Sequence, residues 1–200
     1  MDSSHVAVLP FGGRRVPRRL RGLSVLDTGA DLERLTRARR IVVVGSHADL
    51  ATVLTRLLRA DRLDIEVAHV ARPWQARRAL TGTAVRVPLI RDETGTVIAR
   101  AAYWLPQDGV RTVVGEAVVD DELLFNGEVT GVRIEPISAV PGLRASALRG
   151  RMRPKRWVTG RAAQLGTTGA LVVRDGNQAP RPVRRSTFYR HTEGWLRVAS

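Results

Sequence analysis

The chain has 200 residues, of which 44% are hydrophobic and 26% are charged, a composition typical of a globular protein with a buried core. It contains no cysteine, which excludes disulfides and thiolate metal sites, and no apolar run near the ~20 residues that cross a bilayer. The N-terminal residues lack the charged start and long apolar core of a signal peptide, so we expect a cytoplasmic protein.

The net charge is +14, and arginine carries almost all of it because Lys155 is the only lysine. Two explanations of this charge stay open. A GC-rich genome places arginine at ordinary surface positions, whereas a selected basic surface attracts nucleic acid, anionic lipid or phosphorylated ligands. The densest basic segments are residues 13–22 and 141–157, and both are expected to be loops, the first because Pro17 disfavours a regular helix.

The first part of the chain alternates between strand and helix patterns. Residues 5–10 predict a short strand and residues 31–39 a short helix. Residues 41–44 are apolar and β-branched, which is typical of a strand buried on both faces. The apolar spacing over residues 48–60 predicts an amphipathic helix, and residues 64–70 predict a second strand. Strand, helix and strand in this order form a crossover between parallel strands.

The second part of the chain reads as successive strands after a short expected helix over residues 74–80. Turn-forming residues separate the apolar segments, and such pairs are strong hairpin signals. We expect turns at Asp92–Gly95, Asp108-Gly109, Asn126-Gly127, Asp175-Gly176 and Glu193-Gly194. The predicted fold class is α/β + β: an N-terminal Rossmann-like parallel-sheet half over residues 1–85, followed by a β-rich, sandwich-like half over residues 86–200.

One turn is the leading candidate for a binding site. Gly45, Ser46, His47, Ala48 and Asp49 lie between the predicted buried strand and the amphipathic helix, and Ser46 and Asp49 have the spacing of a capping box. The N–H groups and dipole at such a helix start attract phosphate. The alternative is an ordinary strand-to-helix corner that binds nothing.

An α/β half with the sequence VVVG before this turn, followed by a β-rich half with VRDGN at residues 173–177, resembles the diacylglycerol kinase and NAD kinase superfamily. In that family the turn reads Gly-Gly-Asp-Gly-Thr, the glycines admit nucleotide phosphates, and the aspartate serves catalysis. The resemblance implies that Gly45, Ser46, His47 and Ala48 contact a nucleotide, with ATP and Mg²⁺ as cofactors. It makes His47, at the position of the family's aspartate, and Asp49 the candidate catalytic residues.

The sequence departs from the family pattern where phosphoryl transfer needs acids. The family's Gly-Thr-Asn-Asp segment has no counterpart in residues 71–82, and Asn177 replaces the acid of the late Val-Asp-Gly-Glu element. Histidine at position 47 could still act as a base near neutral pH. We therefore predict a degenerate diacylglycerol/NAD kinase-like protein that binds a nucleotide or other phosphorylated ligand, with weak or no kinase activity.

Two alternatives stay open. The first is a basic, non-catalytic module that binds nucleic acid or an acidic partner, because residues 181–195 interleave arginines with Phe188, Tyr189 and Trp195. The same alternation also fits a β core. The second is an active kinase that uses relocated acids. We predict no metal site, since the four histidines lack ligand spacing and residues 120–122, Asp-Asp-Glu, are more typical of a solvated hairpin turn than of a Mg²⁺ site.

Overall fold

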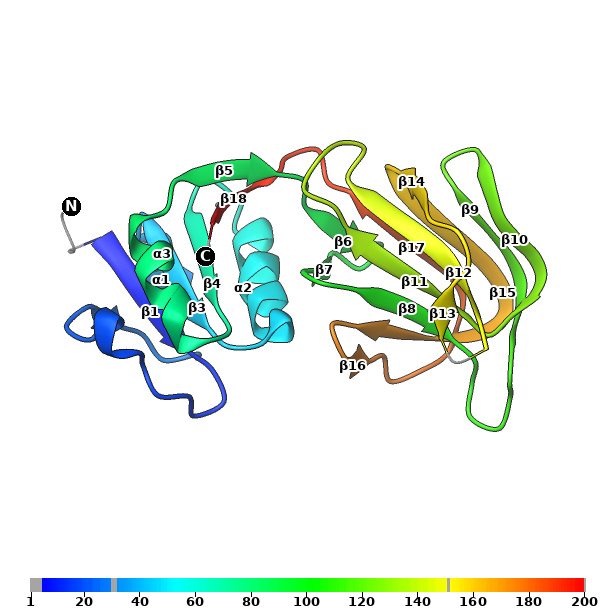
Figure 1. The fold of residues 1–200 in the computed structure, drawn as a ribbon, viewed down its shortest axis with the longest axis horizontal. Coiled ribbons are helices and arrows are strands. Elements are labelled where there is room, and N and C mark those ends of the chain that lie inside the picture. The colour runs from blue at the N-terminus through cyan, green and yellow to red at the C-terminus, as the bar shows by residue number, and fades with distance from the viewer. Residues whose placement is uncertain (1–4, 30–31, 151, 200) are drawn as a thin grey trace. The chain divides into compact units, whose positions relative to one another are not determined.

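The computed structural model describes residues 5–29, 32–150 and 152–199. The chain forms two compact units (Figure 1). Unit 1 comprises Met1–Val87 and Glu193–Ser200, and unit 2 comprises Pro88–Thr192. We expected residues 86–200 to form one β-rich half, but the C-terminal segment belongs to unit 1, where it adds a strand to the first sheet. Within the described residues, no helix is long and apolar enough to span a membrane.

Unit 1 is built on a mixed six-stranded sheet with the order β2-β1-β3-β4-β18-β5. Five of its strands are parallel, and the edge strand β5 pairs antiparallel with β18. The predicted Rossmann-like half is therefore confirmed. The strands are β1 (Val6–Pro10), β2 (Ser24–Val25), β3 (Arg40–Val44), β4 (Glu66–Val70), β5 (Ala84–Val87) and β18 (Trp195–Val198).

The crossover between β3 and β4 is the best predicted part of the chain. The two strands are parallel neighbours, and α2 (His47–Arg59) connects them. Leu50, Leu54 and Leu57 of α2 are buried, as the apolar spacing predicted. The other helices are α1 (Leu32–Thr36), within the predicted 31–39 but with Asp31 outside the described residues, α3 (Ala76–Thr81), and the 3₁₀ turns η2 (Arg18–Leu20) and η3 (Pro73–Gln75).

Unit 2 is a twelve-stranded antiparallel assembly organised around the long strand β15. Residues 162–166 and Ala170 of β15 pair with β17, with a register shift between Gly166 and Ala170. Residues 163–167 of β15 pair with β9, and residues 171–174 pair with β8. One strand thus contributes to two sheets, whose side chains share one core. The strands are β6 (Ile90–Asp92), β7 (Val97–Ile98), β8 (Ala102–Leu105), β9 (Val113–Val119), β10 (Glu122–Val129), β11 (Gly131–Pro136), β12 (Leu143–Arg149), β13 (Arg153–Pro154), β14 (Val158–Gly160), β15 (Ala162–Arg174), β16 (Asn177–Gln178) and β17 (Val183–Arg190).

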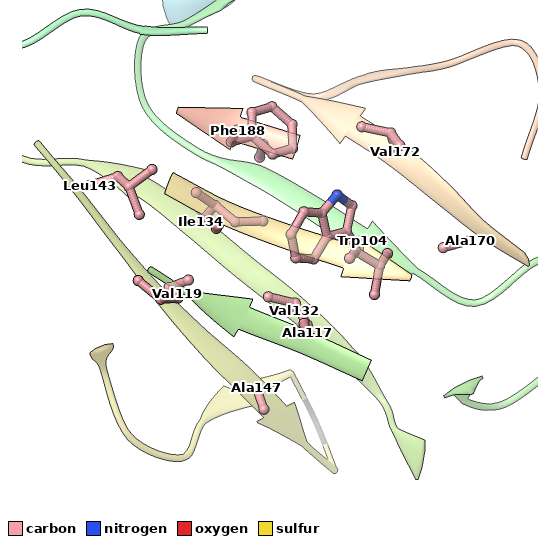
Figure 2. Packing of buried hydrophobic residues seen from close by; sticks show 14 of the residues in the cluster. Trp104, Ala117, Val119, Val132, Ile134, Leu143, Ala147, Ala170, Val172 and Phe188 are labelled. Carbon is pink, nitrogen blue, oxygen red and sulfur yellow. The ribbon is translucent and has the colours of Figure 1, made fainter. Parts of the chain in front are cut away.

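Burial settles the role of two aromatic residues in the C-terminal part of the chain, one in each unit. Phe188 is fully buried and packs against Trp104, with ring centroids 5.9 Å apart, among aliphatic side chains from several strands (Figure 2). Trp195 is buried in unit 1. Neither ring can stack on a nucleic-acid base, so the β-core explanation of this segment holds for both residues.

Two of the five expected turns form hairpins. Asp92–Gly95 joins the paired strands β6 and β7, and Asp175-Gly176 joins β15 and β16. No hairpin forms at the other three positions. The expected turn at Asp108-Gly109 is present, closed by Val110 N–H donating to the Gln107 carbonyl at 3.0 Å, but it links β8 to β9, which do not pair with each other. Glu193-Gly194 links β17 to β18, which belong to different sheets, and Asn126-Gly127 lies inside β10.

The basic stretch 141–157, expected to be a loop, contains strands β12 and β13. Most of β12 is buried in unit 2, including Leu143, Ala147 and Leu148, whereas Arg144 is half-buried and Arg149 is exposed. The arginines of this stretch therefore concealed a largely buried strand. Arg151, which belongs to the same stretch, lies outside the described residues.

Candidate functional site

The candidate site lies at the carboxyl edge of the parallel sheet in unit 1. The ends of β1, β3 and β4 are in register, since Pro10 pairs with Val44 and Val44 pairs with Val70. Two backbone bonds continue this alignment beyond the strands: Phe11 N–H donates to the Val44 carbonyl at 2.9 Å, and Gly45 N–H donates to the Val70 carbonyl at 3.2 Å. The loops after the three strands therefore lie side by side. Ligands of open α/β sheets bind at this edge.

The predicted capping box is present at the start of α2. The Ser46 side chain accepts from the Asp49 N–H at 3.2 Å, and Asp49 Oδ2 accepts from the Ser46 N–H at 2.7 Å and from its hydroxyl at 2.8 Å. The amide of Ala48 lies between the two residues of the capping box and is one of the first N–H groups of α2, which have no partner within the helix. The dipole of this 13-residue helix favours an anion at these groups.

Gly45 is required by packing rather than by backbone conformation. A Cβ at this position would lie 2.5 Å from Asp49 Oδ2 and 2.9 Å from Asp49 Cβ. Any side chain at residue 45 would therefore displace the Asp49 carboxylate and open the capping box. The glycine serves the helix start, whether or not a phosphate approaches it.

A second histidine, which the sequence did not single out, supports the turn from β4. His69 Nε2 lies 3.0 Å from the Gly45 carbonyl, and its ring meets the ring of His47 edge-on with centroids 4.8 Å apart. Burial lowers the pKa of His69, because desolvation disfavours the charged imidazolium; the carbonyls of Gly45 and Ser46 and the carboxylate of Asp49 oppose this effect. A neutral His69 donates its Nε2–H to the Gly45 carbonyl. Its position, one residue before the end of β4, was the signal that could have revealed it.

Arginine from the first loop brings positive charge to the same edge. Gly12 and Gly13 follow β1 with φ of 61° and 68°, a conformation that glycine adopts at little cost. They turn the chain so that Arg14 Nη1 donates to the Ala71 carbonyl at 3.3 Å, just beyond the end of β4. An exposed guanidinium thus lies at the edge where an anion would bind.

Two of the three acidic residues at positions 120–122 are engaged in local structure. Asp120 accepts from the backbone N–H groups of Arg161 and Ala162, each at 2.9 Å, and Glu122 pairs with Arg156. Among the residues that the structure describes, no group of three or more His, Asp or Glu could hold a metal ion. The Mg²⁺ that the family resemblance implies would need a carboxylate at the turn. Asp49 supplies the one carboxylate of residues 45–49, and its Oδ2 is bonded to Ser46.

Comparison with known proteins gives a clear result for the fold alone. No protein-family model matches the sequence, and no curated protein matches it. Among solved structures, an NAD kinase from Archaeoglobus fulgidus in complex with ATP superposes with a TM-score of 0.65 at 14% identity, covering 97% of this chain and 93% of that one. The chain has the fold of this kinase.

Two further structures support the same assignment. A candidate diacylglycerol kinase from Bacillus anthracis superposes with a TM-score of 0.70 at 9% identity, with 98% of each chain covered. Yeast NADH kinase complexed with NADH gives a TM-score of 0.62 at 9% identity, covering 89% of this chain and 67% of that one. The resemblance inferred from the sequence is thus confirmed as a likeness of fold that spans both units. The functional roles of Gly45, Ser46, His47, Ala48 and Asp49 stay predictions.

Proposed function

We propose that the protein is a degenerate diacylglycerol/NAD kinase-like protein that binds a nucleotide or related phosphorylated ligand at the carboxyl edge of unit 1, with weak or no kinase activity. The observation that carries the proposal is the alignment of the Gly45–Asp49 turn with the ends of β1 and β4. Two solved structures of the same fold contain ATP and NADH, which supports a nucleotide as the ligand.

Binding would rest on three groups at this edge. The Ala48 amide and the α2 dipole favour a phosphate, and the Arg14 guanidinium adds a positive charge. The hydrogen bond between His69 Nε2 and the Gly45 carbonyl fixes the start of the turn to β4. These features need no metal ion, which is consistent with a turn whose carboxylate is already bonded.

Weak catalysis follows from the state of the candidate catalytic residues. Phosphoryl transfer requires a positioned base or activating carboxylate. Asp49 is held by Ser46 in the capping box, which leaves His47 as the candidate base at the turn. We assign binding and orientation to Ser46 and Ala48, and the stability of the turn to Gly45 and Asp49.

A pair of variants tests the charge contribution directly. Arg14 is exposed and donates to the Ala71 carbonyl at 3.3 Å, and Arg15 beside it is also exposed. Arg14→Gln and Arg15→Gln remove the same charge, but only the first variant removes the guanidinium assigned to the phosphate site. Loss of one charge-assisted bond should weaken ATP binding about tenfold in Arg14→Gln relative to Arg15→Gln, measured by calorimetric titration.

The proposal also predicts a change in the thermal stability of the wild-type protein. A ligand that binds only the folded state raises the melting temperature by mass action. ATP or NAD at millimolar concentration should therefore raise the melting temperature. If neither compound shifts it, the turn is an ordinary corner and the proposal is wrong.

A second candidate function is the binding of nucleic acid or an acidic partner by the basic surface. The observation in its favour is that Arg14, Arg15, Arg18 and Arg19 are all exposed in the segment after β1. Salt-dependent binding would distinguish this function from nucleotide binding.

A further inference from the structure

Trp74 is the most exposed tryptophan of the chain. It is 69% exposed, whereas Trp104 is fully buried, Trp195 is 9% exposed and Trp157 is half-buried. An indole of this exposure contributes little to the hydrophobic core, so packing does not explain why a tryptophan stands at this position.

The position of Trp74 relates it to the candidate nucleotide site. It lies in η3, which begins three residues after the end of β4, at the same carboxyl edge as the Gly45–Asp49 turn. The chain leading to it is tied to both neighbouring loops: the Val70 carbonyl accepts from Gly45 N–H at 3.2 Å, and the Ala71 carbonyl accepts from Arg14 Nη1 at 3.3 Å.

The backbone around Trp74 is fixed before any ligand arrives. Arg72 N–H donates to Gln75 Oε1 at 2.8 Å, and Gln75 N–H donates back to the Arg72 carbonyl at 3.1 Å. Pro73 fixes φ at the first position of η3. The Arg72 guanidinium lies over the indole, 5.1 Å from the ring centroid, and so restrains the side chain as well. An exposed ring held in this way loses little conformational entropy when it contacts a ligand.

We propose that Trp74 is the base-recognition residue of this site and stacks on the aromatic base of the bound nucleotide, a purine in preference to a pyrimidine because of its larger face. This proposal rests on the proposed function. Aromatic rings paired with arginine are the common platform for stacking bases. The phosphates would then lie at the α2 start and the base at η3, so that two adjacent loops of one edge divide the ligand between them.

The experiment compares a nucleotide with a ligand that has no base. We would measure the binding of ATP and of inorganic tripolyphosphate to the wild type, Trp74→Ala, Trp74→Phe and, as a control, Val85→Ala, which alters another exposed apolar residue of unit 1. Trp74→Ala should weaken ATP binding about tenfold and leave tripolyphosphate binding unchanged. Trp74→Phe should recover much of the loss, and Val85→Ala should match the wild type.

Tryptophan fluorescence gives an independent readout of the same contact. ATP should quench the emission of the wild type but not of Trp74→Phe, and tripolyphosphate should quench neither. Equal ATP affinity in the wild type and Trp74→Ala would overturn the stacking role, while leaving the proposed function intact. If neither ligand binds the wild type, the proposed function fails, and the stacking role fails with it. Because Trp74 is exposed, all variants should keep the melting temperature of the wild type.

Discussion

At the residue scale, the carboxylate of Asp49 has two opposing effects. By accepting from the Ser46 N–H and hydroxyl, it closes the capping box and stabilises the first turn of α2. The same carboxylate places a negative charge at the end of the helix where an anion would bind. The residue that forms the turn thus also lowers its affinity for phosphate.

We predict that Asp49→Asn increases the affinity for ATP and for tripolyphosphate several-fold, because the amide keeps an acceptor for Ser46 and removes the repulsive charge. The gain should shrink as salt is added. The free energy of unfolding should fall by about 0.3–1 kcal/mol, since a negative charge near the helix N-terminus is lost. Titration calorimetry and urea unfolding measure the two effects. Weaker ATP binding by the variant would show that the carboxylate helps to hold the ligand.

His69 makes the stability of unit 1 depend on pH. Its pKa is lowered in the folded protein, so the unfolded chain takes up this proton first as the pH falls below the ordinary value of about 6.5. The contribution of a neutral His69 to stability is therefore present above this value and is lost as the pH falls. Three charged or titratable groups lie near this ring: the Asp49 carboxylate raises the pKa of His69, the Arg14 guanidinium lowers it, and His47 contacts the ring edge-on.

We predict that the free energy of unfolding of the wild type decreases between about pH 7.5 and pH 5, and that part of this decrease disappears in His69→Gln. Glutamine can donate to the Gly45 carbonyl but does not titrate. The comparison of urea unfolding curves at the two pH values isolates His69 from the other histidines. An identical pH dependence in the two proteins would contradict the prediction.

At the element scale, the sequence was informative where one segment decides its own structure. The run 41–44 and the spacing of the leucines after it specify a strand and a helix locally, and both formed, with the capping box between them.

Asn126-Gly127 was misleading because an Asn-Gly pair indicates only a positive φ. Gly127 has φ 109° but lies inside β10, opposite Gly115 of β9, so the backbone bends there without reversing. The actual reversal is at Asp120, with φ 49°.

The parts of the site that escaped prediction depend on long-range pairing. His69 reaches the turn only because β4 lies beside β3, and Trp74 becomes part of the same edge only because β4 ends in register with β3. The return of the chain to unit 1 through β18 likewise depends on its pairing with β4 and β5. No local pattern specifies such partners.

The α2 crossover allows a quantitative test at this scale. Leu54 and Leu57 are each 1% exposed, so replacing either by alanine should lower the free energy of unfolding by about 2–5 kcal/mol through lost burial and the remaining cavity. Thr52→Ala on the exposed face of the same helix serves as the control and should change stability by less than about 0.5 kcal/mol. Chemical denaturation measures all three. Similar losses for Leu54→Ala and Thr52→Ala would mean that this face of α2 is not the buried one.

At the scale of the whole molecule, part of the arginine excess has a structural use. Arg40 is 11% exposed in its side chain, pairs with Glu66 at 2.6 Å, and donates to the carbonyls of Ala79, Leu80 and Gly82 at the end of α3. In unit 2, Arg174 pairs with the buried Asp92. These arginines need no external partner. The exposed arginines after β1 are the ones on which the second candidate function depends.

We predict that, if these exposed arginines bind nucleic acid, affinity for a single-stranded RNA falls steeply with salt, because binding releases counterions from the phosphates. Replacing Arg18 and Arg19 by glutamine removes two charges and should reduce the magnitude of the slope of log K against log salt by roughly 0.7 for each phosphate that is no longer neutralised. Arg77→Gln and Arg78→Gln, exposed on α3, form a control of equal charge. Fluorescence anisotropy over a series of salt concentrations gives each slope. A slope that changes equally in both double variants would assign the binding to net charge rather than to the segment after β1. Absence of binding at low salt would leave the composition of the genome as the source of these arginines.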